Sequence, residues 1–302
     1  MSEVTFSKTI QLIHKEIQGK LNNTNSIIND YIASDIPIIP KLGQYFFKKR
    51  GKQLRPVMCL LSSKMINKNY SKLKTDIYMS AALEFIHAAT LLHDDVIDKG
   101  TTRRGQKSIN EIWNNKFSVL LGDFMFSKSF QLMTQGKSLK AMEHLSEVSS
   151  KISEGEFLQL SNENNANLTS GEYIKIISLK TAELFGAALK VPAILTGKKN
   201  QEIVNLYKLG INFGVIFQIT DDILDYFGDK KIGKEIGKDF MEGKVTLPII
   251  LLLKKVSKLD SIKIKKLFTK NKRNQKELNL ILSQLKKNGI KRDCLNYAKK
   301  YQ

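Results

Sequence analysis

Two runs of aspartate are the residues of this sequence best suited to chemistry. The pattern D-D-x-x-D occurs at Asp94-Asp95-Val96-Ile97-Asp98 and again at Asp221-Asp222-Ile223-Leu224-Asp225. On a helix, the first and last aspartates of each run share a face one turn apart, where their like charges repel. A cation relieves that repulsion, and oxygen-only ligands favour Mg²⁺, which completes its shell with water and substrate phosphates. The two copies therefore predict two facing carboxylate walls that bind Mg²⁺ and a phosphorylated substrate.

Fixed positive charges accompany the first run. The chain has 43 lysines but only six arginines, so arginine is expected where a planar guanidinium has to bind an anion. Arg103 and Arg104 follow the first run. The segment RGKQLRP places Lys52 and Arg55 at a predicted helix start, where free backbone N–H groups also attract anions. These residues predict phosphate binding beside the first run.

The second run has polar neighbours of its own. Lys180 and Thr181 lie in a largely apolar helical segment, SLKTAELFG, and Gln218 lies one turn before the second run. Any single lysine of this chain is more often a surface charge, and Lys180 is the exception because its neighbours are apolar. The lysines that follow the second run are Lys234, Lys238 and Lys244.

Each of these signals alone has a plainer interpretation. A single aspartate run is more often an exposed acidic helix end. His87 lies two turns before Asp94 on the same face, and it is equally consistent with a donor to a phosphate oxygen and with a hydrogen-bonded core histidine. The repetition of the run, each time at the end of an apolar segment, favours chemistry.

The charge of the chain leaves a second class of function open. There are 49 basic and 29 acidic residues, a formal net charge of +20, which is typical of proteins with polyanionic partners. Residues 251–302 alone hold 16 basic and three acidic residues. We interpret this stretch as a solvated lysine-rich face and expect no nucleic-acid partner. A basic helical nucleic-acid-binding protein stays the alternative, although it leaves both aspartate runs unexplained.

Apolar residues recur at helical spacing through almost every segment, and no sustained period of two indicates a strand. Residues 75–98 and 206–229 are apolar nearly all round until they reach the aspartates, which predicts two buried helices. No linker divides the chain. We therefore predict an all-α fold, a single domain over residues 1–302 built as a bundle of about ten or more helices around a central catalytic cavity.

The cysteines and the N-terminus bear on the compartment. Cys59 and Cys294 have no partner motif, which is typical of reduced thiols in a cytosolic protein. The first 20 residues lack the apolar core of a signal peptide, and no apolar run reaches the roughly 18 residues of a membrane span. We expect a soluble, cytoplasmic protein.

From about Gly51 to about Pro248, the motifs resemble those of the trans-type prenyl diphosphate synthases, most closely the bacterial octaprenyl diphosphate synthases. The matching segments, in order, are GKQLRP, EFIHAATLLHDDVID, RRG, GDF, EGEFLQL, KTAELF, FQITDDILDYFGD and GKEIGKDFMEGKVTLP. One departure is Arg50, which stands where many relatives have glycine. The resemblance implies an isoprenoid synthase fold, Mg²⁺ as cofactor and a homodimer.

The resemblance also implies roles for individual residues. Asp94, Asp98 and Asp221, with Asp225, hold a magnesium cluster that binds the allylic diphosphate. The same diphosphate is contacted by Arg103, Lys180, Thr181, Gln218 and Lys234, with Lys244 as a further substrate-binding lysine. Isopentenyl diphosphate is bound by Lys52, Arg55, His87 and Arg104. Catalysis is thereby assigned to Asp94, Asp98, Arg103, Lys180, Asp221 and Lys234.

The resemblance places the control of product length about one turn before Asp94. Short-chain members carry bulky aromatic residues there, whereas this chain has Ala89 and Thr90. A tunnel running past Ile86, towards Phe130 and Met133, favours a long product. We expect an octaprenyl chain for a respiratory quinone such as ubiquinone, made from an allylic primer such as farnesyl diphosphate, with at most peripheral membrane contact for product release.

Several related functions compete with this interpretation. A shorter-chain geranylgeranyl or farnesyl diphosphate synthase would share the motifs. A class I terpene cyclase would carry a second metal motif of Asn, Ser or Thr and Glu instead of the second aspartate run. An HD-type phosphohydrolase, suggested by His93-Asp94, lacks an obvious second pair among four histidines. A silent partner subunit would have lost one aspartate run, and both are intact.

Overall fold

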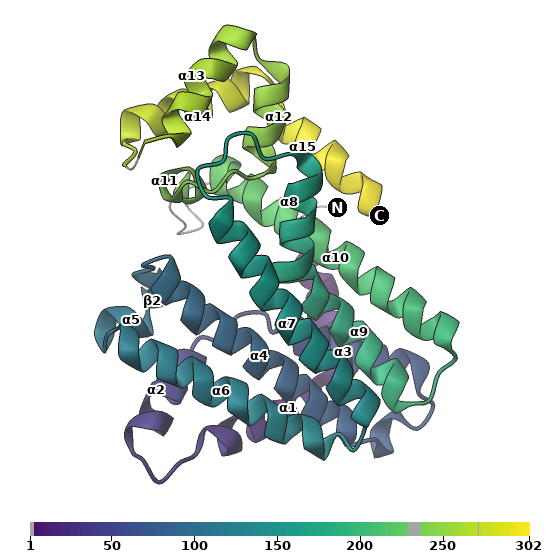
Figure 1. Cartoon of the computed structure of the whole chain (residues 1–302). Coiled ribbons are helices and arrows are strands. Elements are labelled where there is room, and N and C mark those ends of the chain that lie inside the picture. The colour runs from purple at the N-terminus through teal and green to yellow at the C-terminus, as the bar shows by residue number, and fades with distance from the viewer. Residues whose placement is uncertain (1–2, 229–235, 271) are drawn as a thin grey trace. The chain divides into compact units, whose positions relative to one another are not determined.

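The computed structural model describes residues 3–228, 236–270 and 272–302 of the chain. These residues are helical almost throughout, so the prediction of an all-α fold is confirmed (Figure 1). The first helices are α1 (Glu3–Ile32), α2 (Ile38–Phe47), α3 (Leu54–Ile66), α4 (Thr75–Ile97), α5 (Ile109–Ile112), α6 (Asn115–Gln135), α7 (Leu139–Ser161) and α8 (Ser170–Ile177). They are followed by α9 (Glu183–Leu195), α10 (Asn200–Phe227), α11 (Lys238–Glu242), α12 (Leu247–Lys255), α13 (Lys258–Phe268), α14 (Gln275–Lys287) and α15 (Ile290–Ala298). Shorter helical turns are η1 (Tyr70–Lys72), the π-helical η2 (Ser178–Ala182) and η4 (Lys299–Tyr301).

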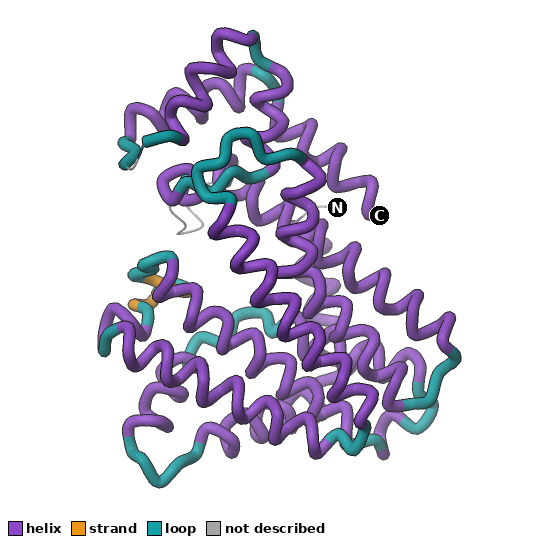
Figure 2. The backbone as a smooth tube through the Cα atoms, in the orientation of Figure 1, coloured by secondary structure: helices purple, strands orange, loops and turns teal. Residues whose placement is uncertain are grey.

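The two strands of the described chain form one small hairpin between α4 and α5 (Figure 2). Strand β1 (Thr102–Arg103) pairs antiparallel with β2 (Gln106–Lys107). The two residues between them, Arg104 and Gly105, have φ angles of 52° and 71°. Positive φ at both central residues is the conformation of a type I′ turn. The sequence analysis did not predict these strands, because two residues are too few to show an alternating pattern.

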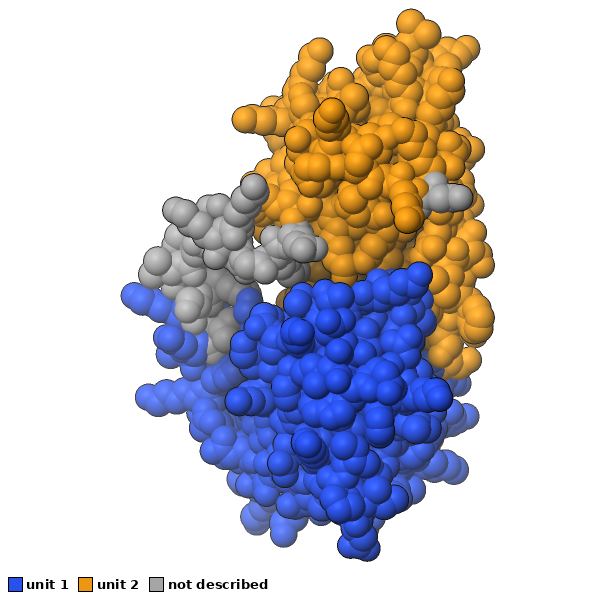
Figure 3. Space-filling view, turned by 90° about the vertical axis from the view of Figure 1, so that its left-hand side faces the viewer, with its two compact units in different colours: residues 1–149, 184–210 blue, residues 150–183, 211–302 orange. Residues whose placement is uncertain are grey.

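The chain forms two compact units (Figure 3). Unit 1 comprises Met1–Ser149 and Leu184–Gly210, and unit 2 comprises Ser150–Glu183 and Ile211–Gln302. The expectation of a single domain stays a prediction.

Helix α4 is the centre of unit 1, where it packs against α1, α3 and α6. Most of its apolar side chains are buried, as the unbroken apolar pattern predicts, and Met79, Leu83 and Phe85 are fully buried. A buried ion pair adds to this packing: Lys20 Nζ of α1 lies 2.7 Å from Asp76 Oδ2 of α4. A buried pair is costly to break, because the remaining charge is left uncompensated.

Unit 2 has its own apolar core, in which α12 packs against α8, α13, α14 and α15. Phe240 and Phe268 meet edge to face in this core, with ring centroids 5.4 Å apart. The guanidinium of Arg273 lies over both rings and donates to the carbonyl oxygens of Met241 and Phe268, at 3.3 and 3.0 Å. Arg273 therefore joins the end of α11 to the end of α13.

Among the described residues, α10 is the one helix long and apolar enough to cross a bilayer. That property rests on length and composition alone, and helices of soluble proteins share it.

Candidate active site

The first aspartate run lies at the end of α4. The helix ends at Ile97 with Asp98 as its C-cap, and the backbone N–H of Asp98 donates to the carbonyl oxygen of Asp94 at 2.8 Å. The side chains of Asp94 and Asp98 are both partly exposed. Both residues thus lie at a helix end, and their role as metal ligands stays a prediction.

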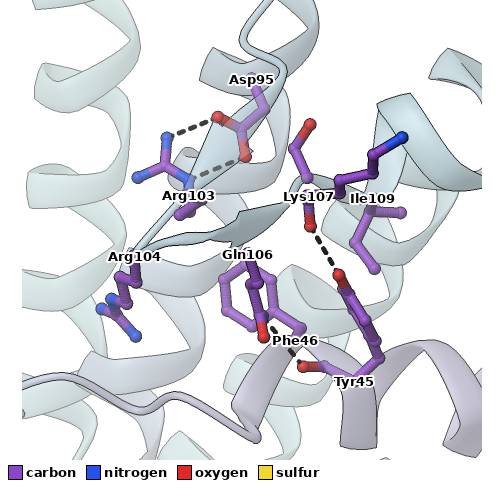
Figure 4. A pocket seen from close by; sticks show the side chains of 9 residues that line it. Tyr45, Phe46, Asp95, Arg103, Arg104, Gln106, Lys107 and Ile109 are labelled. Carbon is purple, nitrogen blue, oxygen red and sulfur yellow. Dashed lines mark hydrogen bonds and ion pairs between the residues drawn. The ribbon is translucent and has the colours of Figure 1, made fainter. Parts of the chain in front are cut away.

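The middle aspartate of this run is buried and engaged. Asp95 is 4% exposed and forms a bidentate ion pair with Arg103 (Figure 4). The Nε and Nη2 atoms of Arg103 donate to Oδ2 and Oδ1 of Asp95, each at 2.7 Å. This geometry is the strong fork arrangement of arginine and carboxylate. It fixes the hairpin to α4, a role that the sequence analysis did not assign to Arg103.

The loop that leads from α4 into the hairpin is held by the same region. Gly100 N–H donates to the carbonyl oxygen of Asp95 at 2.8 Å, and Ser108 Oγ donates to the carbonyl oxygen of Gly100 at 2.7 Å. A Cβ atom at Gly100 would lie 3.0 Å from Oδ1 of Asp95. A side chain at this position would therefore press on the Asp95 carboxylate, which its ion pair with Arg103 holds in place.

The turn of the hairpin contacts the loop between α2 and α3. Arg104 Nη1 donates to the carbonyl oxygen of Lys49 at 2.8 Å, and Lys49 Nζ donates to the carbonyl oxygen of Gly105 at 3.3 Å. Gly51, with φ of 66°, packs so closely that a Cβ there would lie 3.0 Å from Cζ of Arg104. The segments RGKQLRP and RRG, predicted to share a phosphate site, are thus neighbours.

Arg55 supplies a buried cation at the start of α3. Its side chain lies over the Phe185 ring at 4.3 Å, and burial lowers its pKa to about 10, opposed by the charge of Glu84. Among the described residues, its buried Nε has no hydrogen-bond acceptor. A buried donor of this kind is costly unless a ligand accepts from it. Arg55 is therefore suited to binding an anion.

His87 lies in α4 close to the same cations. Burial is the main cause that lowers the pKa of His87 well below 6.5, and the charges of Arg55, Arg104 and Arg103 lower it further. The imidazole is therefore neutral at pH 7, with one N–H left as a donor. Lys52, the remaining predicted member of this group, is exposed on the α2–α3 loop.

A pocket opens beside the hairpin, on the side of α2 (Figure 4). Tyr45 crosses it, with its hydroxyl donating to the carbonyl oxygen of Lys107 at 2.8 Å and its ring edge to face with Trp113. The pocket is lined by Tyr45, Phe46, Asp95, Arg103, Arg104, Gln106, Lys107, Ser108 and Ile109. It is the place where α2 contacts strand β2 of the hairpin, since Gln106 Nε2 also donates to the carbonyl oxygen of Tyr45 at 3.3 Å.

The second aspartate run lies near the end of α10 and repeats the pattern of the first. Asp222, its middle member, is 4% exposed and accepts hydrogen bonds from Tyr173 Oη at 2.6 Å and Gln218 Nε2 at 2.7 Å. Burial raises the pKa of Asp222 to about 7, and the two hydrogen bonds oppose that rise. Gln218 Oε1 in turn accepts from Thr181 Oγ1 at 2.9 Å. The structure thereby brings together two predicted residues, Thr181 and Gln218, and adds Tyr173.

Lys180 lies in the π-helical turn η2, directly before α9. It forms an ion pair with Glu156 of α7, and a Cβ at Gly155 would lie 2.5 Å from the Lys180 backbone nitrogen. Glycine at 155 therefore permits the close approach of α7 to η2. Single π-turns inside helical segments are frequent at functional sites, because they reorient side chains.

The outer aspartates of the second run differ in their surroundings. Both Asp221 and Asp225 are partly exposed. The carboxylate of Asp225 accepts from the backbone N–H groups of Lys238 and Asp239, at 3.1 and 3.3 Å, at the start of α11. Asp225 thus holds the start of α11 in addition to its predicted metal role.

Two of the three predicted lysines after the second run, Lys238 and Lys244, lie within the described residues. Lys238 Nζ lies 3.2 Å from Glu242 Oε1, and Lys244 Nζ lies 3.0 Å from Glu242 Oε2. Lys234 lies outside the described residues. Within the described ranges, no three His, Cys, Asp or Glu side chains converge on one metal position.

The residues predicted to control product length lie within unit 1. Ile86 and Ala89 are buried in α4, and Thr90 is partly exposed, with its hydroxyl donating to the carbonyl oxygen of His87 at 2.8 Å. On α6, Met133 is buried and Phe130 is 36% exposed. Helices α4 and α6 pack together. The tunnel itself stays a prediction.

The site residues are distributed over both units. The first run, the hairpin and the residues Lys52, Arg55 and His87 belong to unit 1, whereas η2 and the second run belong to unit 2. The facing of the two aspartate walls therefore stays a prediction.

Comparison with known proteins identifies the family. The sequence profile described as "Polyprenyl synthetase" matches residues 36–285. The chain belongs to the polyprenyl synthetase family. It is 40% identical over 242 residues to the octaprenyl diphosphate synthase of Escherichia coli, covering 80% of this chain and 74% of that protein. The predicted family, fold and enzyme class, a trans-prenyltransferase, are thereby confirmed.

Other polyprenyl synthetase relatives differ in their products. An all-trans-nonaprenyl-diphosphate synthase of Rhodobacter capsulatus is 38% identical over 227 residues, covering 75% of this chain and 69% of that protein. A crystal structure of a polyprenyl synthase from Caulobacter crescentus, complexed with calcium and isoprenyl diphosphate, superposes with a TM-score of 0.92 at 34% identity. That likeness covers 97% of this chain and 88% of the other. Family membership thus leaves the chain length open.

Proposed function

We propose that the protein is a Mg²⁺-dependent prenyltransferase that condenses an allylic diphosphate, such as farnesyl diphosphate, with successive molecules of isopentenyl diphosphate. Its product is a long all-trans polyprenyl diphosphate of eight isoprene units, which supplies the side chain of a quinone. The observation that carries the proposal is the shared design of the two aspartate runs. In each, the middle aspartate is buried and engaged, and the outer two lie partly exposed at the end of an apolar helix.

The donor set fits a hard divalent cation. Asp94 on α4, Asp98 at its C-cap and Asp221 on α10 offer carboxylate oxygens only, as Mg²⁺ prefers. Substrate diphosphate oxygens and water would complete its shell. When bound, Mg²⁺ neutralises negative charge that develops on the departing diphosphate. Asp225 contributes less directly, because its carboxylate already holds the start of α11.

The protein's own cations divide between the two substrates. Lys52, Arg55 and Arg104 bind the diphosphate of isopentenyl diphosphate, and the neutral His87 donates one N–H to it. The orphaned Nε of Arg55 gains its acceptor in this complex. The allylic diphosphate is bound by Lys180, Thr181, Gln218, Lys234 and Lys244. Arg103 contributes to the allylic site indirectly, because its ion pair with Asp95 holds the hairpin in place.

The reaction needs no protein nucleophile. The C–O bond of the allylic diphosphate breaks, and the fixed cations stabilise the charge on the leaving group in a site closed to water. The double bond of isopentenyl diphosphate attacks the allylic cation and forms the new C–C bond. One proton then leaves carbon 2 of the added unit for an oxygen of the released diphosphate, which regenerates an allylic diphosphate. The protein's contribution is binding, orientation and electrostatic stabilisation.

Small residues before Asp94 support a long product. Ala89 and Thr90 leave room for a growing chain where bulky side chains would stop it, and Ile86 lies one turn deeper in α4. We propose that the chain grows along the α4–α6 interface towards Met133. The protein acts in the cytoplasm as a homodimer, with at most peripheral membrane contact when the product leaves.

Paired variants test the metal assignment. Incorporation of labelled isopentenyl diphosphate into farnesyl diphosphate is measured at several Mg²⁺ concentrations for Asp94→Asn, Asp221→Asn and the matched control Asp35→Asn, an exposed aspartate in the loop after α1. We expect the first two to lose at least about 100-fold in rate, in the range for removing a transition-state charge contact, and the control to keep its rate. Near-normal rates for either site variant would contradict the proposal.

A further inference from the structure

Arg50 is held by two asparagines of α1. Its Nη2 donates to Asn29 Oδ1 at 2.6 Å, and its Nη1 donates to Asn25 Oδ1. Asn25 and Asn29 lie one helical turn apart, so one guanidinium fork reaches both. Gln53 Nε2 also donates to Asn25 Oδ1, at 2.9 Å. Two side chains of the α2–α3 loop are thus fastened to the same face of α1.

The loop that Arg50 fastens has an unfavourable backbone. Gly51 has φ of 66°, and Gln53, which is not glycine, has φ of 45°. A left-handed conformation at a non-glycine residue costs about 1–2 kcal/mol and persists only where the surroundings impose it. Arg50 and Gln53 impose it from the α1 side. From the other side, Arg104 donates to the carbonyl oxygen of Lys49.

The fastened loop carries the candidate site for isopentenyl diphosphate. Lys52 lies within it, and Arg55 follows it in the first turn of α3. A loop that becomes ordered only on binding would lose affinity to the conformational entropy of ordering. In a loop that is already ordered in the folded protein, binding does not include that entropic cost. Contacts remote from the substrate can therefore set its affinity.

We propose that Arg50, together with Asn25 and Asn29, is a positioning residue for the isopentenyl diphosphate site. Arg50 orders the α2–α3 loop, and through it Lys52 and Arg55, before the substrate arrives. The inference rests on the proposed function. It assigns a role to a residue that stands where many relatives carry glycine.

The test uses variants on both sides of the contact. Arg50→Met removes the fork without adding backbone freedom, the pair Asn25→Ala with Asn29→Ala removes its acceptors, and the triple variant removes both. The dissociation constant of isopentenyl diphosphate is measured by calorimetry, and KM is measured for both substrates. Arg292→Met, an exposed arginine of α15, is the matched control.

We expect Arg50→Met to weaken isopentenyl diphosphate binding about fivefold, on the order of the conformational entropy lost in ordering one loop residue. The asparagine pair should weaken binding at least as much, because it also removes the acceptor of Gln53. Adding Arg50→Met to that pair should have no further effect, because the fork then has no acceptor to lose. KM for the allylic diphosphate and kcat at saturation should stay within about twofold. Arg50→Lys, which retains the charge and one donor group, should recover part of the affinity.

Three results would overturn the inference. If Arg50→Met weakens binding and the asparagine pair does not, Arg50 acts on the diphosphate by its own charge. If thermal stability falls while the dissociation constant is unchanged, the contact is structural only. If affinity is unchanged in every variant, the loop is ordered without it. A native protein that neither binds nor extends isopentenyl diphosphate would instead contradict the proposed function.

Discussion

Arg103 and Asp95 form a bidentate ion pair in which both N···O distances are 2.7 Å, and this pair fastens the hairpin to the end of α4. Asp222 has the equivalent place in the second run, where Tyr173 and Gln218 donate to its carboxylate. In both runs the middle aspartate is thus a structural anchor. The outer aspartates are partly exposed, and they are the ones that we propose as cation ligands.

Breaking the first anchor should destabilise unit 1. We expect Arg103→Met to lower the free energy of unfolding by about 2 kcal/mol, because the Asp95 carboxylate stays buried without its partner. The double variant Asp95→Asn with Arg103→Met should recover part of that loss. Urea unfolding measures both against Arg292→Met, which removes an exposed arginine. Equal stability of Arg103→Met and the native protein would show that the pair is not an anchor.

Breaking the second anchor should weaken the binding of the allylic diphosphate and not that of isopentenyl diphosphate. Tyr173→Phe removes a 2.6 Å hydrogen bond to a buried carboxylate, at a cost of about 1–2 kcal/mol in stability. Because Asp222 orients Gln218, which contacts Thr181, we expect KM for the allylic diphosphate to rise and KM for isopentenyl diphosphate to stay constant. Steady-state kinetics with each substrate varied in turn provides the measurement. Tyr31→Phe, on α1, is the control, and equal changes in both KM values would argue against the assignment.

His87 should make stability depend on pH. Its pKa is lowered in the folded protein, so below pH 6.5 the unfolded chain binds a proton that the folded protein does not. The contribution of neutral His87 to the free energy of unfolding is therefore fully present above pH 6.5. It is lost as the pH falls towards the folded pKa, by at most about 1.4 kcal/mol per pH unit. Urea unfolding between pH 5 and 7.5 should show a steeper loss for the native protein than for His87→Gln. Parallel profiles would contradict the buried, neutral state of His87.

Gly155 should not tolerate a side chain. A Cβ there would lie 2.5 Å from the backbone nitrogen of Lys180, so Gly155→Ala must push α7 and η2 apart. We expect a loss of about 1–3 kcal/mol in stability and a lower turnover rate, since Lys180 moves with η2. Gly19→Ala is a matched control, because nothing lies within 4 Å of a Cβ at that exposed helical position. That control should gain about 0.5–1 kcal/mol from helix propensity. Similar stabilities of the two variants would refute the close approach.

The helices that carry the aspartates were predictable because their pattern is strong. Residues 75–98 were expected as a helix, and α4 spans Thr75–Ile97. The second helix was expected from residue 206, whereas α10 begins at Asn200. Its first turns are polar and partly exposed, so they carry no apolar period that the sequence could show.

Contacts between distant residues were not predictable in the same way. Nothing in the spacing links Tyr173 to Asp222, or Arg50 to Asn25 and Asn29, because each pair is joined only by the packing of separate helices. The Arg104-Gly105 turn offered one weak signal, a glycine after two arginines. The hydrogen bond from the start of α11 to Asp225 could not be predicted either, because the sequence does not distinguish an aspartate that caps a helix from one that binds a metal.

Chain elongation is the central claim, and one measurement addresses it most directly. The purified protein is incubated with farnesyl diphosphate, radiolabelled isopentenyl diphosphate and Mg²⁺, and the dephosphorylated products are separated by length. We predict a Mg²⁺-dependent ladder that ends at one long product of eight isoprene units. A ladder that ends at four units would contradict the predicted depth of the tunnel, and no elongation from any allylic primer would contradict the synthase itself.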